Sequence, residues 1–485
     1  MALSEVAPFA KTGGLADVGS ALPKALKEQG HDIRVIMPQY RVINERKYVL
    51  RDVIRLQDIA VQLGKKTIKV NVKAAFIPNS KVQVYFIDYR PFFFREGLYV
   101  DPKTGKEYPD NADRFILFAK GTLETLKKLQ WQPDIVHCND WQTGLLPLFL
   151  KSLYADDSFY TKIRTLLTVH NFVYQGVFSK KCLPLLNLDE NCRIEDLGIL
   201  QNGKCNFLQA GLSSADLLNT VSTTYSKEVQ SSPEFGCGME SLLRKRKSDF
   251  FGIVNGLDES VWNPETDDLI PQVYTRTDLG GKQEARKELL ERLQLTSDAS
   301  VPVVGMVSRL TLQKGFELIL EAMDDLMKMN LVLVVLGVGE KKYETAFRRA
   351  EKKYKNKVRF QPMFDESLAH LIAAGSDLFL MPSLQEPCGL TQLFSLKYGT
   401  VPIVHHTGGL ADTIKPFQTK KKTGTGFVFK SPSADKMLAA VKEAVKTFAN
   451  PALWNKLIQN GMKEDHSWQV SSNEYVQLYQ KCILK

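Results

Sequence analysis

Two basic side chains follow a strongly apolar segment in the second half of the chain. Arg309 and Lys314 come directly after residues 303–307, a β-branched run that predicts a buried strand. Ligands of open parallel sheets bind at the carboxyl ends of the strands. A guanidinium and an ammonium placed there suit a diphosphate, and they neutralise the charge that develops when a diphosphate leaves. Such a pair is more often ordinary surface charge, but the position after a core strand favours a binding site.

An acidic turn follows a second apolar run, residues 378–381. The turn is Glu386-Pro387-Cys388-Gly389, and we expect a helix to begin from Gly389 onward. A carboxylate at this turn can bind sugar hydroxyls or stabilise positive charge at a sugar carbon, while the backbone N–H groups of the helix face phosphates. The alternative is an ordinary acidic residue at a helix N-terminus. The concentration of unusual residues in one turn favours the site.

One internal repeat accompanies these motifs. The hexapeptide Thr-Gly-Gly-Leu-Ala-Asp occurs at residues 12–17 and again at 407–412, where it follows the predicted strand 401–404. Each copy is therefore predicted as a strand-to-helix turn. Paired glycines allow a ligand to approach the backbone, and free N–H groups at a helix start attract anions. We expect the two turns, one from each sheet, to face one cleft, and the alternative is that both are plain tight turns.

Two polar residues follow strands of the first half. His170 comes directly after the strand 165–169, and Asp140 follows 135–137. Both are hydrogen-bonding candidates for a ligand, although a lone histidine is more often structural. No Asp-x-Asp pair and no histidine cluster at metal spacing occurs, so the sequence predicts no metal site.

The elements that must position these residues form the same pattern twice. Strand-like runs alternate with helical patterns such as 115–126 and 316–323, which is typical of doubly wound α/β domains with parallel sheets. The predicted strands are 33–37, 82–87, 135–137, 165–169 and 217–221, then 303–307, 331–336, 378–381 and 401–404. A turn at Asn255-Gly256 predicts domains at 1–255 and 256–465, with a C-terminal helix in 466–485 that packs back on the first domain.

Composition excludes several classes of protein. A chain of 485 residues is too long for one core, and 44% hydrophobic with 24% charged residues is typical of a globular enzyme. No segment has the length and apolarity of a membrane helix, and no signal peptide is evident, which favours a cytoplasmic protein with no membrane partner. The seven cysteines are scattered without a Cys-x-x-Cys pair, which predicts reduced thiols.

The net charge of +10 raises nucleic-acid binding as an alternative. Its best support is the two basic runs 244–247 and 420–422. Both lie in segments that we expect to be loops, and neither contains the interleaved aromatic residues of a single-strand platform. We therefore interpret them as solvated surface and expect no nucleic-acid partner.

Residues 4–18, SEVAPFAKTGGLADV, closely resemble the opening of bacterial glycogen synthases and plastid starch synthases, glycosyltransferase family 5. The resemblance continues through ordered motifs that span nearly the whole chain: residues 108–111, 139–144, 168–171, 255–258, 308–310 with 314–315, 386–392 and 407–410. It implies a GT-B fold, in which two Rossmann-like doubly wound domains face a deep cleft. It also implies ADP-glucose as donor, an α-glucan or maltooligosaccharide acceptor extended at its non-reducing end with retention, and neither metal nor cofactor.

The resemblance also implies roles for individual residues. On the donor, Lys11 and the backbone of Gly13 and Gly14 face the phosphates, and Arg309 and Lys314 hold the diphosphate from the other side. Glu386 binds the transferred glucose, His170 contacts it with its carbonyl near the anomeric carbon, and Asp140 shapes the acceptor side. The amides of Cys388 and Gly389 help Glu386, Thr391 lies near the phosphates, and Asn255 and Leu390 complete the donor-binding set. The departing phosphate guides the incoming hydroxyl, so no separate nucleophile is required.

The chain departs from the wider pattern in three ways. Phe394 stands where many GT-B enzymes carry a second glutamate, as is usual in this family, so ribose recognition must come from elsewhere. Only Met1-Ala2-Leu3 precedes Ser4, so we expect the first strand to be abbreviated. No appended carbohydrate-binding module or transit peptide is evident, which favours the bacterial type, with a plastid location open if a transit peptide was removed.

Two alternative functions remain open. One is a catalytically silent protein that keeps the fold and binds glucan, and the other is a related transferase that uses UDP-glucose. The charged site residues favour an active enzyme over a silent one. We also expect the region of Asn255 to act as a hinge when the anionic donor binds. The sequence predicts no oligomeric state.

Overall fold

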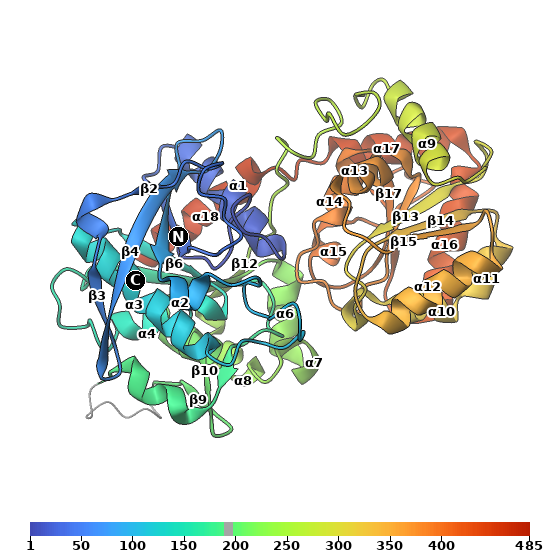
Figure 1. The fold of residues 1–485 in the computed structure, drawn as a ribbon. Helices are drawn as coiled ribbons and strands as arrows, with labels where there is room; N and C mark the ends of the chain where they lie inside the picture. Colours follow the sequence, from blue (N-terminus) through green and yellow to red (C-terminus); the bar gives the residue numbers. More distant parts are fainter. Residues whose placement is uncertain (189–196) are drawn as a thin grey trace. The chain divides into compact units, whose positions relative to one another are not determined.

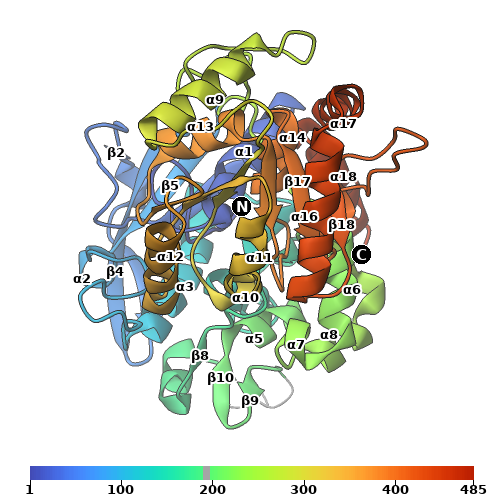
Figure 2. The same cartoon turned by 90° about the vertical axis from the view of Figure 1, so that its right-hand side faces the viewer.

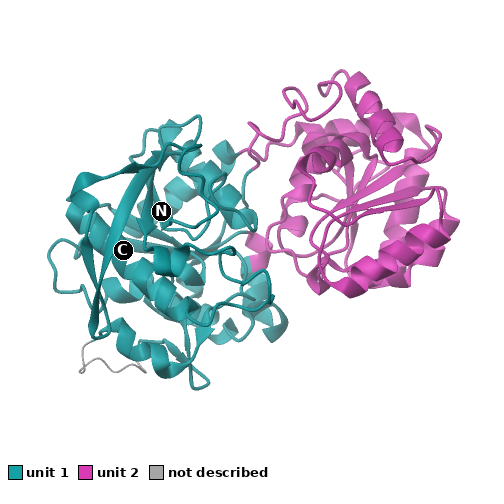
Figure 3. Ribbon diagram, viewed as in Figure 1, with its two compact units in different colours: residues 1–221, 226–256, 468–485 teal, residues 222–225, 257–467 magenta. Residues whose placement is uncertain are grey.

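The computed structural model describes residues 1–188 and 197–485, which divide into two compact units (Figure 3). Unit 1 contains residues 1–221, 226–256 and 468–485, and unit 2 contains 222–225 and 257–467. The chain therefore passes between the units after residues 221, 225, 256 and 467. Asn255, the predicted hinge, stands beside one of these four connections.

The parallel sheet of unit 1 has the strand order β12-β11-β7-β6. Its strands are β6 (Ile135–Asn139), β7 (Arg164–Val169), β11 (Leu217–Thr220) and β12 (Phe250–Gly252). Ala2 forms isolated parallel bridges to Cys138 in β6 and to Ile36 in the neighbouring sheet. The first strand predicted by the family resemblance is thus reduced to a single bridging residue.

The neighbouring sheet of unit 1 combines one parallel pair with antiparallel strands that the sequence analysis missed. Its order is β1-β5-β4-β2, with β3 beside β4. The strands are β1 (Arg34–Pro38), β2 (Arg51–Asp52), β3 (Ile59–Leu63), β4 (Lys66–Phe76) and β5 (Gln83–Asp88). In β3 buried and exposed residues alternate strictly, which is typical of an antiparallel strand with one solvated face. Because only alternate residues are buried, β3 does not stand out as a buried apolar run.

The helices of unit 1 include one from each end of the chain, and these two lie side by side (Figure 1). The α-helices are α1 (Gly14–Glu28), α2 (Arg90–Phe93), α3 (Asn111–Leu129), α4 (Leu145–Leu150), α5 (Phe207–Ser214), α7 (Pro233–Gly236), α8 (Glu240–Lys245) and α18 (Trp468–Ile483), and α6 (Thr223–Ser231) begins in unit 2. Val18 and Leu22 of α1 share a buried apolar cluster with Tyr475 and Leu478 of α18. The C-terminal segment is therefore part of the core of unit 1.

Short 3-10 turns and a small antiparallel sheet complete unit 1. The turns are η1 (Ile54–Leu56), η2 (Trp141–Thr143), η3 (Lys180–Leu186) and η4 (Lys247–Asp249), and the sheet contains β8 (Val177–Phe178), β9 (Leu200–Gln201) and β10 (Lys204–Asn206). Tyr479 of α18 adds a polar anchor, because its hydroxyl lies 2.8 Å from Nδ1 of the buried His137. The other ring nitrogen of His137 lies 2.7 Å from Oγ1 of Thr168, so the imidazole joins α18 to β6 and β7.

Unit 2 contains a six-stranded parallel sheet with the order β15-β14-β13-β16-β17-β18. The strands are β13 (Val303–Val307), β14 (Val332–Leu336), β15 (Val358–Gln361), β16 (Leu378–Met381), β17 (Val401–His405) and β18 (Phe427–Phe429). All four strands predicted for this half are confirmed. The short edge strands β15 and β18 were missed because their apolar runs are brief.

Helices cover both faces of the sheet of unit 2, and Figure 2 looks onto α10, α11, α12 and α16. Successive residues of β14 alternate between two buried clusters, with Leu333 and Val335 in one and Val334 in the other. The helices are α9 (Gly280–Arg292), α10 (Phe316–Glu321), α11 (Met323–Lys328), α12 (Lys341–Lys353), α13 (Glu366–Gly375), α14 (Thr391–Lys397), α15 (Gly408–Thr413), α16 (Ala434–Phe448) and α17 (Pro451–Lys463), with the 3-10 turn η5 (Leu312–Lys314). The predicted doubly wound arrangement is confirmed.

Candidate active site

A small pocket of unit 2 lies at the carboxyl ends of β13 and β16, and it gathers three of the predicted site residues, Lys314, Glu386 and Thr391. Its full lining is Met306, Val307, Ser308, Lys314, Phe379, Leu380, Met381, Pro382, Ser383, Glu386 and Thr391. Ligands of parallel sheets bind at this edge. The turns that follow β13 and β16 therefore line one pocket within unit 2.

The Lys314 and Glu386 side chains form an ion pair in this pocket. The Lys314 Nζ atom lies 2.6 Å from Glu386 Oε2, and the Ser383 hydroxyl donates to the same oxygen at 2.9 Å. Glu386 is only 5% exposed, and a carboxylate with so little solvent needs a counter-charge and hydrogen-bond donors. The pair therefore places one acidic and one basic side chain on the same small cavity.

A tight glycine turn explains how Lys314 reaches the pocket. Gly315 follows η5 with φ of +72°, and a Cβ atom added to it would lie 2.0 Å from the Pro382 carbonyl oxygen. Only glycine combines this left-handed backbone with such a close approach. The turn after β13 therefore packs directly on the turn after β16.

The second copy of the repeated hexapeptide supports the Glu386 turn. The N–H of Gly409 donates to the carbonyl oxygens of Glu386 and Pro387 at 3.1 and 3.2 Å. A Cβ atom on Gly408 would lie 1.9 Å from the Glu386 carbonyl oxygen, and one on Gly409 would lie 2.0 Å from that of Cys388. Glycine is therefore required at both positions for the close packing of this turn on the Glu386 turn, and an approach of the two glycines to a ligand stays a prediction.

Helix α14 begins where the sequence predicts a helix start. Leu390 is its N-cap residue, and Gly389 before it has φ of +73°. The Gln392 side-chain amide donates to the carbonyl oxygens of Cys388 at 3.1 Å and Gly389 at 3.0 Å, which ties the turn to the first turn of the helix. The donor-binding roles of Cys388, Gly389, Leu390 and Thr391 stay predictions.

Arg309 differs from Lys314 in its surroundings. It is exposed, and its guanidinium forms no ion pair or hydrogen bond with any residue in the described ranges 1–188 and 197–485. It does not line the pocket that contains Lys314 and Glu386. The Arg309 guanidinium is therefore available to an anionic ligand.

In unit 1 the structure brings Asp140 and His170 together at the carboxyl ends of β6 and β7. The His170 backbone N–H donates to Asp140 Oδ1 at 2.7 Å, and the His170 Nε2 atom lies 3.0 Å from Asn139 Oδ1. Asp140 has φ of +57°, a conformation rare outside glycine that is enriched at functional sites. The carboxylate therefore fixes the main chain of His170.

Burial shifts the pKa values of this pair in opposite directions. Desolvation raises the pKa of the Asp140 carboxyl to about 7 and lowers the pKa of the His170 imidazole to about 4. The imidazole is therefore uncharged at neutral pH, whereas Asp140 titrates near neutrality. A neutral imidazole suits hydrogen bonding to sugar hydroxyls better than pairing with a phosphate.

The loop before α1 contains the remaining predicted residues of unit 1. Lys11 is exposed, and its Nζ atom lies 2.6 Å from Oδ1 of Asp17 in the first turn of α1. The Gly13 N–H donates to Glu5 Oε2 at 3.3 Å, and the donor-binding roles of Lys11, Gly13 and Gly14 stay predictions. Gly14 is the first residue of α1.

Asn255 lies next to the connection after residue 256, one of the four between the units. It is buried within unit 1, and its side-chain oxygen has no hydrogen-bond partner among the described residues. A Cβ atom on the following Gly256 would lie 2.5 Å from the Trp468 Cα atom, so α18 begins directly against this turn. The predicted donor contact of Asn255 stays a prediction.

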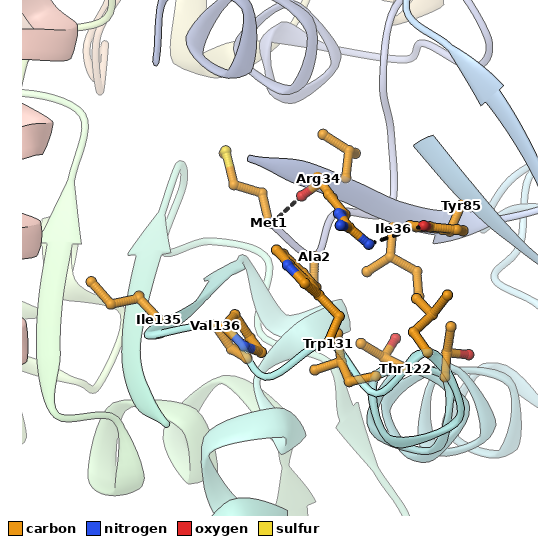
Figure 4. A pocket seen from close by; sticks show the side chains of 14 residues that line it. Met1, Ala2, Arg34, Ile36, Tyr85, Thr122, Trp131, Ile135 and Val136 are labelled. Atoms are coloured by element: carbon orange, nitrogen blue, oxygen red, sulfur yellow. Dashed lines mark hydrogen bonds between the residues drawn. The ribbon is translucent and has the colours of Figure 1, made fainter. Parts of the chain in front are cut away.

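A second pocket, in unit 1, lies beside the bridging residue Ala2 near the N-terminus (Figure 4). The Met1 amino group donates to the Arg34 carbonyl oxygen at 2.7 Å, and Ala2 bridges Ile36 of β1 and Cys138 of β6. The lining includes the first residues of β1 and β6 together with residues of α3 and Tyr85 of β5, whereas Asp140 follows the carboxyl end of β6. This pocket therefore contains none of the predicted site residues.

The described residues can be searched for metal sites, membrane helices and disulfides. No cluster of histidine, cysteine and acidic side chains that could hold a metal occurs in residues 1–188 and 197–485. In the same ranges no helix has both the length and the apolarity to cross a membrane. The six described cysteines are free thiols, and Cys192 lies outside the described residues.

Known protein families match both halves of the chain. Residues 1–245 match the family model of the starch synthase catalytic domain, and residues 289–464 match the glycosyl transferases group 1. The chain is also 41% identical over its full length to a glycogen synthase of Syntrophotalea carbinolica, covering 98% of that protein. It belongs to the glycogen synthase and starch synthase family. A glycogen synthase of Thermotoga maritima is equally similar, with 41% identity over 99% of this chain and 98% of its own.

Solved structures agree with membership of the glycogen and starch synthase family. The catalytic domain of starch synthase IV from Arabidopsis thaliana, bound to ADP and acarbose, has a TM-score of 0.89 and 31% identity over 100% of this chain and 99% of its own. A sucrose-phosphate synthase from Thermosynechococcus elongatus shares the fold at a TM-score of 0.58 and 16% identity, over 99% of this chain and 95% of its own. The predicted GT-B fold and the assignment as a glucosyltransferase of glycogen or starch synthesis are confirmed.

Glu5 contacts the loop of Lys11 but was not singled out from the sequence. Its carboxylate contacts the loop of Lys11, Thr12 and Gly13, although it stands several residues before that loop. The one available signal was an acidic residue, Glu5, in a short apolar segment that precedes the glycines. A buried carboxylate requires hydrogen-bond donors, but the sequence alone does not predict which groups donate to Glu5.

Proposed function

We propose that this synthase transfers glucose from ADP-glucose to the non-reducing end of an α-1,4-glucan with retention of configuration. The observation that carries the proposal is the Lys314–Glu386 ion pair in a pocket at the carboxyl ends of β13 and β16. A cation and an anion side by side match a donor whose diphosphate is negative and whose sugar carbon becomes positive during transfer. The starch synthase bound to ADP and acarbose supports the same pairing of nucleotide and saccharide.

Within unit 2 we assign the diphosphate to Lys314 and Arg309 and the glucose to Glu386. Lys314 neutralises charge as the bond to the sugar breaks, and Arg309 adds a second cation from an exposed position. Glu386 accepts hydrogen bonds from ring hydroxyls. Cys388, Gly389, Leu390 and Thr391 lie on the same turn and complete this side of the donor.

We assign two roles to residues of unit 1: they bind the acceptor, and they make a second set of contacts with the donor. Uncharged His170 bonds to the glucose, and Asp140 holds the main chain of His170 while it shapes the acceptor side. Lys11 and the N–H of Gly14 contribute a cation and a helix-start amide to the same phosphates, and Asn255 supplies an amide. The departing phosphate receives the proton of the attacking hydroxyl, which needs no nucleophile from the chain.

The test is release of ADP when the folded protein is incubated with ADP-glucose and glycogen. A catalytically silent glucan-binding protein would sediment with glycogen and release no ADP. A transferase that uses UDP-glucose would release UDP and lose little of that activity to competing ADP-glucose. We further expect a chelator to leave the rate unchanged, because no step of the proposal uses a metal.

A further inference from the structure

The Glu5 carboxylate forms an unusual set of hydrogen bonds under the loop that contains Lys11. Glu5 is 4% exposed, and no described residue forms an ion pair with it. Its oxygens accept from the Thr12 N–H, from the Thr12 hydroxyl at 2.6 Å and from the Gly13 N–H at 3.3 Å. The Tyr99 hydroxyl also donates to Oε1, at 2.8 Å. Three donors of one short loop therefore converge on a single buried anion.

These contacts determine the shape of the loop. Gly13 is the N-cap of α1 in an extended conformation, and its own position offers no side-chain cap. Hydrogen bonds to an ionised acceptor are stronger than neutral ones, and a buried carboxylate that loses its donors is costly. Glu5 thus holds the loop, and the Tyr99 hydroxyl adds a further hydrogen bond to the carboxylate. Burial raises the pKa of Tyr99 well above its usual value, so its hydroxyl remains a donor.

The hydrogen bonds to Glu5 determine which groups of the loop remain available to bind a ligand. The N–H groups of Thr12 and Gly13 are directed at Glu5, whereas Lys11 is exposed. The first N–H groups of a helix have no partner inside the helix, and Gly14 is the first residue of α1. A ligand phosphate at this loop therefore meets the Lys11 ammonium and the helix start, while the negative charge of Glu5 stays behind the backbone.

We propose that Glu5 is a positioning residue, which turns the Thr12 and Gly13 amides inward so that Lys11 and the start of α1 face the phosphates of the nucleotide sugar. The inference rests on the proposed function, because it takes the loop to be part of the donor site. It goes beyond that function by assigning the geometry of the loop to an acidic side chain that does not touch the donor.

The variant Glu5→Gln tests the inference, because it keeps the size of the side chain but replaces one acceptor oxygen by an N–H donor. The Thr12 and Gly13 N–H groups can then bond only to a neutral amide oxygen, and the Thr12 and Tyr99 hydroxyls must turn to accept from the amide NH2 group, so the loop loses its charge-assisted hydrogen bonds. We expect the Kd for ADP, measured by calorimetry, to rise at least about tenfold, and the KM for ADP-glucose to rise in parallel. We expect kcat at saturating donor and the KM for glycogen to stay within about twofold.

Two further variants separate positioning from general stability. Glu96→Gln makes the same charge change at an exposed residue that forms long ion pairs with Arg41 and Lys103, and it should leave ADP binding unchanged. Thr12→Val removes only the hydroxyl bond to Glu5 and should raise the Kd for ADP by a smaller factor. A purely structural role of Glu5 would instead lower the melting temperature or the folded fraction and leave the Kd of the folded chain unaltered.

The outcomes distinguish this inference from the proposed function. ADP release by the wild type tests the function, whereas ADP binding by the variants tests Glu5 without any turnover. Wild-type affinity for ADP in folded Glu5→Gln would overturn the inference. If that variant does not fold, wild-type affinity in Thr12→Val would overturn it equally. A wild-type chain that binds no ADP would overturn both proposals.

Discussion

The Lys314 ammonium lies 2.6 Å from a carboxylate oxygen of Glu386, and the two residues come from turns that follow the adjacent strands β13 and β16. Each charge stabilises the other in a pocket with little solvent. A bound donor would give each of them a second partner, the diphosphate for Lys314 and the sugar for Glu386. The pair therefore holds both side chains at the pocket in the absence of a donor.

The first prediction concerns the charge of Glu386. Glu386→Gln removes the anion next to the sugar and leaves Lys314 without its counter-charge, so we expect turnover to fall at least about tenfold, or about 1.4 kcal/mol of barrier. The measurement is ADP release at saturating ADP-glucose and glycogen. Glu443→Gln, an exposed residue of α16, is the matched control. Near-wild-type turnover in Glu386→Gln would remove this residue from the site.

The second prediction concerns Arg309. Its side chain forms no ion pair or hydrogen bond within the described part of the chain, so Arg309→Ala should fold with an unchanged melting temperature. We nevertheless expect ADP release to slow at least about tenfold, because the diphosphate loses a cation. The control is Arg349→Ala on the exposed side of α12. Equal rates for the two variants would show that Arg309 is ordinary surface charge.

The third prediction concerns pH. The pKa of Asp140 is about 7 in the folded chain and 3.8 ordinarily, so between these values the folded state holds a proton that the unfolded state has released. This group therefore makes the free energy of unfolding fall as pH rises from about 4 to about 7. Asp140→Asn keeps an acceptor for the His170 N–H but removes the titration. The stability of the variant relative to wild type should increase across this interval.

Chemical denaturation at about pH 5 and about pH 8 measures that difference. His170, with its pKa lowered to about 4, acts in the opposite direction between about 4 and 6.5. Because both proteins contain His170, its contribution cancels to first order in the comparison. A stability difference that does not change with pH would contradict the assignment to Asp140.

The fourth prediction concerns the packing of α18 in unit 1. Leu478 is 5% exposed in the cluster that joins α18 to α1, so Leu478→Ala should cost about 2–5 kcal/mol of unfolding free energy. Ile483 near the end of the same helix is 49% exposed, and Ile483→Ala should cost less than about 1 kcal/mol. Urea denaturation compares the two. Similar costs would mean that α18 is not part of the core.

Much of the fold could be predicted because its strands are continuous apolar runs. Residues 303–307 and 401–404 stand out in this way, and the strands β13 and β17 begin at the predicted residues. The charges that follow such strands could be placed at the sheet edge by topology alone. The antiparallel strands β3 and β4 were not predicted, because buried residues alternate with more exposed ones in them and neither strand is a continuous buried run.

The repeated hexapeptide shows what local sequence cannot predict. In the first copy Asp17 pairs with Lys11 and Gly13 donates to Glu5, whereas Asp412 of the second copy accepts a hydrogen bond from Ser222 Oγ at 2.7 Å. Six identical residues thus have different partners, because the partners come from elsewhere in the chain. The same reason explains why the contact of Glu5 with the loop was not foreseen.

The central claim is that the chain is an ADP-glucose-dependent glucan synthase, and the most direct test is nucleotide release with both nucleotide sugars. Purified protein, shown to be folded by its melting transition, is incubated with glycogen and either ADP-glucose or UDP-glucose. We predict that ADP is released with ADP-glucose and glycogen together, at a rate well above that of UDP from UDP-glucose, and that the glycogen gains glucose in equal amount. Release of no ADP above background by the folded protein would contradict the account.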